Sequence, residues 1–374
     1  MSKTPSLKLD RSSLLKAINL TSRLASNRPA LPALSFLLFE AVDSKLIIYA
    51  TNLEQSTKVE LEAQIEANYR FTLPGRLFNE YLNSINSIEL ELRLINPTTI
   101  ECLTENGRVE FRGLDPDEYP QPSFTQDKPL LSLPASEWKQ AFSLVVYATA
   151  LDDTRPTLAG VFILVSNDEL VIAATDSYRL AEKIIKLKTP LKLSNPQKLI
   201  IPKESISELV RLLSDQSGDT SVFVGDNSIE WQVDGLRFSS RLIDGNYPDY
   251  RAIIPTEHQT RLTVNTADCL AALKTTQLFA REVGNTVKLT AEPDNGLTIE
   301  SVADQRGQAL QKLTAITEGQ PMQASFNVKY LLDALSVMSA DNLFFENQAA
   351  DRPLVIRETN LTGYLALVMP LRLD

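Results

Sequence analysis

The stretch LKLDRSSLLKAINLTSRL, residues 7–24, holds the pattern that decides the fold of this chain. It begins with a short alternation of apolar and polar residues, which is typical of a strand, and continues with Leu14 and Ile18 at helical spacing. Similar stretches recur as LSLPASEWKQAFSLVVYA from Leu131 and as LTVNTADCLAALKTTQLFA from Leu262, at offsets of 124 and 131 residues. This regular recurrence indicates an internal repeat.

A second pattern, of strand, helix and strand, also occurs three times. It reads YRFTLPGRLFNEYLNSINSIELELRL from residue 69, KLIIPKESISELVRLLSDQSGDTSVFVG from residue 198 and QASFNVKYLLDALSVMSADNLFFE from residue 323. Aligning Pro74, Pro202 and Asn327 gives offsets of 128 and 125 residues. Six segments at nearly constant spacing predict three copies of one unit that contains two helices.

The strand predictions rest on alternation of apolar and polar residues, which is clearest in IELELRL (88–94) and visible in SVFVG (221–225) and IEWQV (229–233). Each pattern indicates a half-buried antiparallel strand, and one apolar stripe along each helix indicates packing on a sheet. We predict an α+β fold of three repeated domains, each with two helices on one side of antiparallel sheet. The predicted domains are residues 1–126, 127–254 and 255–374.

The composition is that of a globular protein with more than one domain. A chain of 374 residues with 43% hydrophobic residues is long enough for two or three domains. Its formal charge of −10 argues against binding nucleic acid by overall attraction, so such a contact would need a local basic surface. Cys102 and Cys269 are expected to be reduced core residues of a cytoplasmic protein. We expect no leader peptide and no membrane span.

Several classes of active site lack their residues. No two of the 13 glycines lie closer than six positions, which excludes GxGxxG, Walker A and GxSxG motifs. His258, the single histidine, lies in a polar stretch and is expected in a solvated loop, so zinc and Ser-His-Asp sites are excluded. The doublets Asp115 with Asp117 and Asp152 with Asp153 are expected on solvated turns. No metal and no cofactor are predicted.

The polar faces of the predicted helices carry basic residues at repeating positions. These residues are Lys16, Arg23, Arg76, Lys139, Lys203, Arg211, Lys274, Arg281 and Lys329. Two interpretations are open, because Lys and Arg are ordinary residues of a solvated helix face. If all six helices face one space, the same residues form a weakly basic surface for a polyanion, which would contact phosphates without reading bases.

The stretch ATDSYRLA (174–181) gathers hydroxyl, carboxylate, phenol and guanidinium groups between apolar flanks. These groups are able to supply a nucleophile, a base and an oxyanion clamp. One hypothesis is therefore an enzyme that uses Asp176, Tyr178 and Arg179, with or without Asp152 and Asp153. It predicts turnover and dependence on a substrate or metal.

A second hypothesis comes from six stretches taken together. They are NRPALPAL (27–34), TRPTLAGVFI (154–163), ATDSYRLA, LIDGNYPDYRAIIP (242–255), FNVKYLLDAL (326–335) and VMPLRLD (368–374). In this order and at this spacing they resemble the bacterial DNA polymerase III beta subunit family, the replication sliding clamps. The resemblance runs along nearly the full length, and the threefold repeat is what that family requires.

The resemblance implies the DNA clamp fold and a head-to-tail dimer of three-domain subunits that closes into a six-domain ring around duplex DNA. Helices would line the hole and sheets would form the outside. Such a protein is a processivity factor that tethers a polymerase and has no catalysis, so it needs no cofactor. The resemblance also implies a bacterial, cytoplasmic and nucleoid-associated protein. A third hypothesis is a clamp-like scaffold that never encircles DNA.

The resemblance places a peptide-binding pocket at the ATDSYRLA stretch, where short motifs of the replicative polymerase, the clamp loader and repair polymerases insert apolar side chains. Leu, Ile and Met would form an adaptable apolar floor, while Arg179 and Thr175 would hold polar groups of the peptide. Asp176 is expected to set a turn. The pocket would use Leu158, Thr175, Ser177, Tyr178, Arg179, Leu180, Pro248, Ile253, Tyr330, Leu367, Val368, Met369, Pro370, Leu371 and Arg372.

The resemblance also implies a DNA surface and a dimer surface. The DNA-contacting residues would be Arg28, Arg76, Arg155, Thr157, Lys203 and Arg211. The dimer interface would use Leu278 and Phe279 of the third domain against Phe111 of the first domain of the other subunit. The chain departs from the family pattern at Pro156, Thr157, Ser177, Tyr178 and Ala252, which bears on peptide preference and on details of DNA contact.

Overall fold

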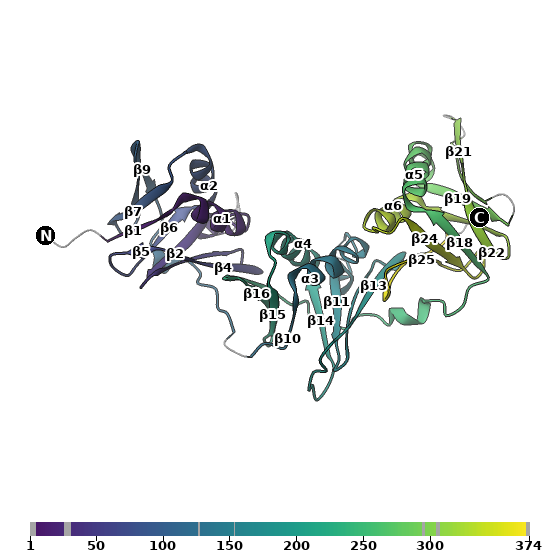
Figure 1. The fold of residues 1–374 in the computed structure, drawn as a ribbon, viewed down its shortest axis with the longest axis horizontal. Coiled ribbons are helices and arrows are strands. Elements are labelled where there is room, and N and C mark those ends of the chain that lie inside the picture. Colours follow the sequence, from purple (N-terminus) through teal and green to yellow (C-terminus); the bar gives the residue numbers. More distant parts are fainter. Residues whose placement is uncertain are drawn as a thin grey trace. The chain divides into compact units, whose positions relative to one another are not determined.

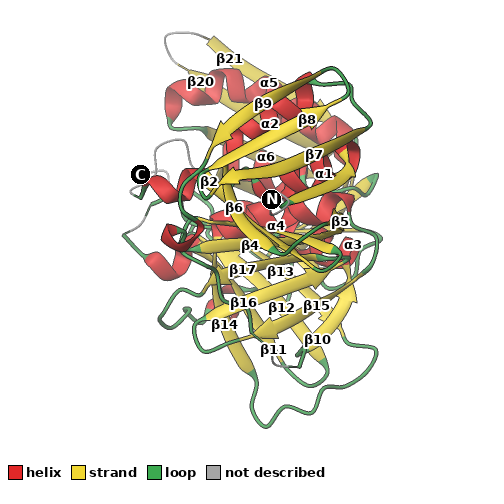
Figure 2. Cartoon of the chain, turned by 90° about the vertical axis from the view of Figure 1, so that its left-hand side faces the viewer, coloured by secondary structure: helices red, strands yellow, loops and turns green. Residues whose placement is uncertain are grey.

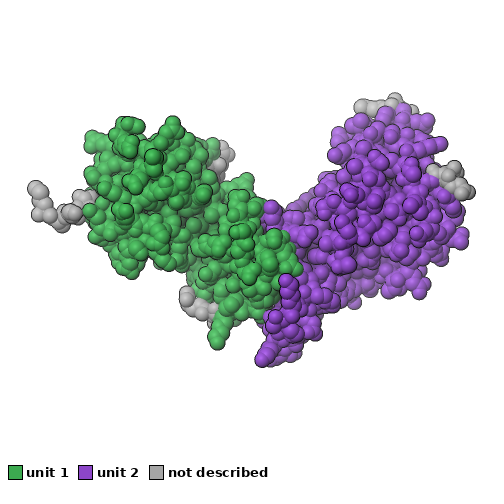
Figure 3. All heavy atoms as spheres, viewed as in Figure 1, with its two compact units in different colours: residues 1–138, 211–242 green, residues 139–210, 243–374 purple. Residues whose placement is uncertain are grey.

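The computed structural model describes residues 5–25, 31–125, 128–152, 154–293, 296–303 and 307–371 (Figures 1 and 2). The chain forms two compact units, which Figure 3 colours separately. Unit 1 comprises residues 1–138 and 211–242, and unit 2 comprises residues 139–210 and 243–374. The division falls inside α3 (Ala135–Ser143) and α4 (Lys203–Leu212), so the predicted central domain contributes to both units. The predicted domain limits remain a prediction.

Unit 1 contains two antiparallel sheets and the helices α1 (Arg11–Thr21) and α2 (Gly75–Ser84). The five-stranded sheet has the order β5 (Gln64–Ile65), β1 (Ser6–Asp10), β7 (Glu89–Asn96), β8 (Thr99–Thr104), β9 (Gly107–Arg112). The eight-stranded sheet has the order β10 (Leu131–Pro134), β15 (Asp219–Val224), β16 (Ser228–Val233), β17 (Leu236–Arg241), β4 (Gln55–Glu62), β3 (Lys45–Thr51), β2 (Phe36–Val42), β6 (Tyr69–Pro74).

Unit 2 also contains two antiparallel sheets, with the helices α5 (Thr266–Ala280) and α6 (Val328–Ser336). The nine-stranded sheet has the order β14 (Gln197–Pro202), β11 (Gly160–Val165), β12 (Glu169–Thr175), β13 (Arg179–Lys186), β26 (Tyr364–Val368), β25 (Leu354–Glu358), β24 (Asn342–Asn347), β18 (Thr260–Asn265), β22 (Ala315–Gly319). The four-stranded sheet has the order β21 (Gly307–Leu313), β20 (Gly296–Ala303), β19 (Thr286–Glu292), β23 (Met322–Asn327).

The two large sheets follow one plan. In unit 1 the order β15-β16-β17-β4-β3-β2-β6 passes from strands of the second repeat to strands of the first. In unit 2 the order β24-β25-β26-β13-β12-β11-β14 passes in the same way from the third repeat to the second. Consecutive repeats are therefore joined by main-chain hydrogen bonds, between β4 and β17 and between β13 and β26. The predicted α+β fold of repeated antiparallel units is confirmed.

Local sequence explains where three of the helices begin. Asp10, Asn265 and Asn327 each precede a helix and accept a backbone N–H of its first turn, which satisfies a donor that the helix leaves unpaired. On the helix side of the first repeat, the rings of Phe39 and Phe71 stack at 4.8 Å, and Phe78 of α2 meets Phe39 edge to face. Leu14 and Ile18 are fully buried, as their helical spacing predicts. None of the described helices is both long and apolar enough to cross a membrane.

The two cysteines are free and buried, as expected for reduced core residues. Burial raises the pKa of the Cys102 thiol to about 11 and that of Cys269 to about 12. We expect neither thiol to react with a disulfide reagent at pH 8 in the native protein, since at most about one thiol in a thousand is ionised and both are inaccessible. Spectrophotometric titration before and after unfolding in urea measures this. Rapid labelling of the native protein would contradict it.

Candidate functional site

The turn at residues 176–178 joins β12 to β13 and is held by side chains of its own sequence. Asp176 Oδ1 accepts the backbone N–H groups of Tyr178 at 2.9 Å and of Arg179 at 3.0 Å. Thr175 Oγ1 donates to the carbonyl of Arg179 at 2.6 Å and accepts the Ser177 N–H at 3.1 Å. Ser177 has a φ of 79°, which is unusual for a residue other than glycine. The prediction that Asp176 sets the turn is confirmed.

Arg179 lies in a buried ionic cluster on the helix side of the sheet. Its Nε donates to Asp176 Oδ2 at 2.9 Å and its Nη1 donates to Asp333 of α6 at 2.5 Å. The Tyr330 ring lies 4.7 Å from its guanidinium carbon and the Tyr147 ring 5.6 Å. The side chain is only 4% exposed. Arg179 therefore connects the turn to α6. The sequence suggested that Arg179 and Thr175 hold polar groups of a peptide, but the side chains of both residues already form hydrogen bonds within the chain.

The two tyrosines of the same cluster do not supply a general base. Burial raises the pKa of the Tyr147 phenol above its ordinary value, and burial also raises the pKa of Tyr330. Both phenols remain protonated at neutral pH. The Asp176 carboxylate bonds both the turn and Arg179, so two residues of the enzyme hypothesis have structural roles, while the Tyr178 side chain is exposed.

The opposite face of the sheet carries an apolar cluster. Leu180 of β13 lies opposite Leu367 of β26 and both are buried, with Met369 packed beside them. Met369 N–H donates to the Tyr178 carbonyl at 2.8 Å, which fixes the C-terminal segment to the turn. The other members of the cluster are Phe162, Ala173, Ile200, Tyr250, Val355 and Leu365, with Leu164, Ile243, Tyr247 and Ile254 packed against them.

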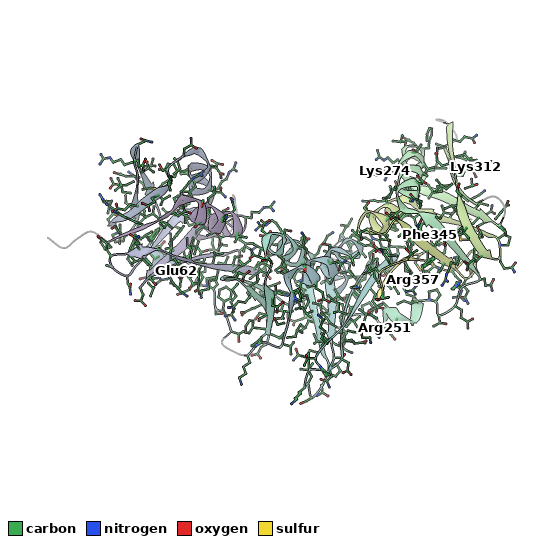
Figure 4. All side chains as sticks on the ribbon, in the orientation of Figure 1. Glu62, Arg251, Lys274, Lys312, Phe345 and Arg357 are labelled. Atoms are coloured by element: carbon green, nitrogen blue, oxygen red, sulfur yellow. The ribbon has the colours of Figure 1, made fainter. Side chains whose placement is uncertain are left out.

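The connector at residues 243–254 crosses this apolar face. Tyr247 Oη accepts the Thr175 N–H at 3.0 Å, so the connector and the turn are bonded directly. Tyr250 Oη donates to Glu182 at 2.6 Å, and Arg251, labelled in Figure 4, donates to the same carboxylate at 3.2 Å. Ile253 remains 40% exposed at the connector's end.

The structure thus divides the predicted pocket residues between two faces of one sheet end. Leu180, Leu367 and Met369 lie on the face that the connector covers. Arg179, its strand partner Val368 and Tyr330 lie on the helix side. Tyr178 is 59% exposed, whereas Leu158 is buried in the short helix at Pro156–Ala159. Pro248 is exposed, Pro370 and Leu371 are half-buried, and Arg372 lies outside the described residues.

The predicted DNA-contacting residues have mixed surroundings. Arg76 is exposed but pairs with Glu80 on α2 at 2.8 Å. Arg211 donates to the carbonyls of Asn19 and Leu20 at the end of α1, where a cation complements the helix dipole. Arg155 donates to Ser177 Oγ at 2.9 Å, which places the predicted DNA loop against the turn.

The remaining predicted basic residues are less constrained. Lys203 and Thr157 are half-buried, and Arg28 lies outside the described residues. Lys16, Lys274 and Lys329 are exposed on their helices, and Figure 4 labels Lys274 on α5. Arg23 and Arg281 follow the last residues of α1 and α5, so the predicted basic stripes extend past the helix ends.

The predicted dimer residues differ in exposure. Phe111 is only 3% exposed, and its ring packs edge to face on Phe78 and Tyr81 at 5.3 Å, so it belongs to the core of unit 1. Val109, two residues earlier on the edge strand β9, is 37% exposed. Leu278 is 63% exposed as expected, and Phe279 is half-buried. Val302 and Leu310 are two further exposed apolar residues that sequence reasoning missed.

The other polar candidates have local roles. His258 is 37% exposed outside helices and strands, with its Nδ1 3.9 Å from Glu346. Asp115 accepts the Asp117 N–H and Asp152 accepts the Thr154 N–H, which are turn contacts. Asp153 lies outside the described residues. Within the described ranges no group of three His, Cys, Asp or Glu residues is arranged to hold a metal ion.

Comparisons with known proteins agree along the whole chain. Family models for the N-terminal, central and C-terminal domains of the DNA polymerase III beta subunit match residues 6–123, 132–249 and 251–372. The beta sliding clamps of Bacillus subtilis and Staphylococcus epidermidis are 29% and 28% identical, over 97% of this chain and 98% of theirs. The crystal structure of the DNA polymerase sliding clamp from Bacillus subtilis superposes with a TM-score of 0.94 at 27% identity, covering all of both chains.

A further solved structure carries a bound compound. The sliding clamp of Bartonella birtlesii, solved bound to griselimycin, is 26% identical, has a TM-score of 0.91 and covers 98% of this chain and 99% of its own. Repeated two-helix units joined through continuous antiparallel sheets define the DNA clamps, a class of ring-forming accessory proteins. The chain belongs to the DNA polymerase III beta subunit family, the bacterial sliding clamps. The predictions of a processivity factor and of an accessory subunit without catalysis of its own are confirmed, and the enzyme and scaffold hypotheses gain no support.

The ionic cluster around Arg179 makes a testable contribution to stability. Replacing Arg179 with Leu leaves Asp176 and Asp333 without their cation in a largely buried site, so we expect the free energy of unfolding to fall by about 3–5 kcal/mol. Urea unfolding followed by circular dichroism measures the loss. The matched control is Arg155→Leu, whose exposed side chain should change stability by less than about 0.5 kcal/mol. Equal losses in both variants would contradict the role assigned to the cluster.

Proposed function

We propose that two copies of this chain close head to tail through β9 of one copy and β21 of the other, and that partner proteins dock beside the turn at residues 176–178. The observation that carries this proposal is the strand order of the sheets. The two large sheets each join two repeats, whereas the five- and four-stranded sheets each end at a strand, β9 and β21, without a further partner among the described residues.

Joining the two open edges reproduces the plan of the large sheets. The combined order would be β5-β1-β7-β8-β9-β21-β20-β19-β23, which corresponds strand for strand to β22-β18-β24-β25-β26-β13-β12-β11-β14. The two intramolecular junctions also suggest the register. Phe238 lies opposite Thr57 and Ala366 opposite Ala181, and the equivalent pair across the proposed interface is Val109 with Ala309.

Apolar side chains at the open edges support this interface. Val109 on β9 is 37% exposed and Leu310 on β21 is 48% exposed, although unpaired apolar edge strands promote aggregation unless they are covered. Leu278, 63% exposed, follows on α5, which packs against β21. A face of this kind is typical of an obligate interface between subunits. Phe111 would support it from the core beneath β9.

We further propose that the ring holds duplex DNA by topology, with weak phosphate contacts from residues on the helices and loops. The exposed Lys16, Lys274 and Lys329 supply positive charge in a chain whose formal charge is −10. Arg28, Arg76, Arg155, Thr157 and Lys203 remain proposed contacts. Arg211 has a supporting role, because its guanidinium is bonded to the end of α1.

The proposed docking site uses the apolar cluster around Leu180, Leu367 and Met369 together with the exposed Tyr178 and Ile253. Apolar side chains of short peptides from the replicative polymerase, the clamp loader and repair polymerases would pack there, since burying such groups is favourable. Griselimycin, bound by the Bartonella birtlesii clamp, is a ready probe. We assign the domains to residues 1–126, 127–254 and 255–374, and the protein to the cytoplasm and nucleoid of a bacterium.

The edge-strand interface predicts a monomeric variant. Val109→Asp combined with Leu310→Asp places a carboxylate on each open edge, so we expect the dimer to dissociate because the charges would be buried without partners. Light scattering coupled to size exclusion gives the mass. The matched control is Ile316→Asp, a 67% exposed apolar residue on β22, which should leave the dimer intact. A dimer that survives the double substitution would exclude this interface.

Topological binding of DNA predicts a dependence on DNA shape. After loading by a clamp loader onto nicked circular DNA, the protein should stay bound in high salt and should be released once the circle is cut, because phosphate contacts are screened by salt and the ring slides off a free end. Gel filtration of the complexes measures retention. Equal release from both DNAs would indicate electrostatic binding only, and equal retention would indicate a tight direct contact; either result would overturn the proposal.

A further inference from the structure

We infer that unit 1 contains a second copy of the docking-site scaffold of unit 2 that does not bind apolar groups, here called the closed copy. Three side-chain positions decide which copy binds. Those positions hold Leu180, Leu367 and Met369 in unit 2. Their counterparts in unit 1 are Ser56, Ser239 and Arg241. The inference rests on the proposed docking site and deepens it, because it identifies the side chains that make one of two nearly identical scaffolds a site for apolar peptide groups.

The turns of the two copies match bond for bond. Thr51 Oγ1 donates to the Gln55 carbonyl at 2.9 Å, as Thr175 Oγ1 does to the Arg179 carbonyl at 2.6 Å. Asn52 Oδ1 accepts the backbone N–H groups of the two residues that precede and begin β4, at 3.1 Å and 2.7 Å, as Asp176 does before β13. Leu53 has a φ of 76°, close to the 79° of its counterpart Ser177.

The surroundings of the turns match as well. Tyr119 Oη accepts the Thr51 N–H at 3.1 Å, as Tyr247 Oη accepts the Thr175 N–H at 3.0 Å. Each turn is therefore bonded to a connector, the first at residues 113–125 in unit 1 and the second at residues 243–254 in unit 2. Arg241 N–H donates to the Glu54 carbonyl at 2.9 Å, as Met369 N–H donates to the Tyr178 carbonyl at 2.8 Å. These shared bonds build the scaffold in both units and therefore do not distinguish them.

The strand register identifies the positions that differ. Ser56 pairs with Ser239 between β4 and β17, as Leu180 pairs with Leu367 between β13 and β26. Arg241 then corresponds to Met369: each follows directly after the last residue that pairs with the neighbouring strand, Ser240 in β17 and Val368 in β26. One floor is consequently apolar and mostly buried. The other presents two half-buried hydroxyls and a guanidinium that is 56% exposed.

This difference in chemistry is enough to close the unit 1 copy. An apolar peptide side chain gains free energy by leaving water for Leu, Leu and Met, and Met adapts to its shape. Against Ser56 and Ser239 it would displace water from hydroxyls without offering a hydrogen bond. Ser56 Oγ already donates to Thr51 Oγ1 at 2.9 Å, and Arg241 lies 3.9 Å from Glu54, so both polar groups have local partners that favour the closed state.

The test replaces the three polar residues of the closed copy with their apolar counterparts from unit 2. In the variant Ser56→Leu, Ser239→Leu, Arg241→Met we expect calorimetric titration with griselimycin to show two sites per chain, where the unchanged protein shows one. The matched control Ser56→Thr, Ser239→Thr, Arg241→Lys keeps the polar character and should retain one site. One site in a folded opened variant would overturn the inference while leaving the docking site of unit 2 standing. No binding to the unchanged protein would overturn the docking site, and the inference with it.

A second variant keeps the inference testable if the opened variant does not fold. Met369→Arg introduces into unit 2 the residue that unit 1 carries, and we expect griselimycin affinity to fall at least about tenfold with an unchanged far-ultraviolet circular dichroism spectrum. Arg241→Met alone should leave the affinity of the unit 2 site unchanged. Undiminished affinity in Met369→Arg would show that this position does not decide binding, which would overturn the assignment.

Discussion

The hydrogen-bonding groups along the edges of strands are the constraint on which the rest of the structure depends. A strand that ends a sheet leaves its N–H and C=O groups without strand partners, and proteins cover or pair such edges. Between repeats the chain meets this demand itself, by pairing β4 with β17 and β13 with β26. In the described part of the chain, the edges β9 and β21 have no equivalent neighbour. Ring closure by a second copy would therefore be the same interaction that joins the repeats, formed between chains.

The connectors between repeats are placed by buried charges. Glu230 accepts the Thr125 N–H at 2.9 Å and pairs with Arg237, which fastens the first connector to β16 and β17. Glu182 accepts hydrogen bonds from Tyr250 and Arg251 and fastens the second connector in a comparable way. A buried carboxylate is costly unless it is paired, so each fixes one path for the chain above it. The second path covers most of the apolar face and brings Tyr247 to the turn that borders the docking site.

The repeat and its elements could be predicted from the sequence, because periodicity and motif spacing are local properties. Side-chain roles that depend on distant partners could not. Arg179 has a side chain suited to binding a ligand, yet it pairs with Asp333, which lies 154 positions away in the sequence. Phe111 and Val109 lie two residues apart on a short edge strand and therefore point to the same face, and only the packing of Phe78 and Tyr81 shows that Phe111 is covered while Val109 is exposed. Arg211 could not be separated from the other helix cations without knowing that the end of α1 lies beside it.

The acidic net charge of the chain is compatible with DNA binding because a ring encloses the duplex. A protein with a formal charge of −10 gains little from long-range attraction to DNA, and Arg76 and Arg211 direct part of their positive charge to Glu80 and to α1. Topology removes the need for affinity, because an enclosed duplex leaves only at an end. Phosphate contacts are independent of sequence and let a protein slide along DNA, and contacts that are weak add little resistance to that movement. Weak, internally screened cations are therefore the charges that a sliding ring requires.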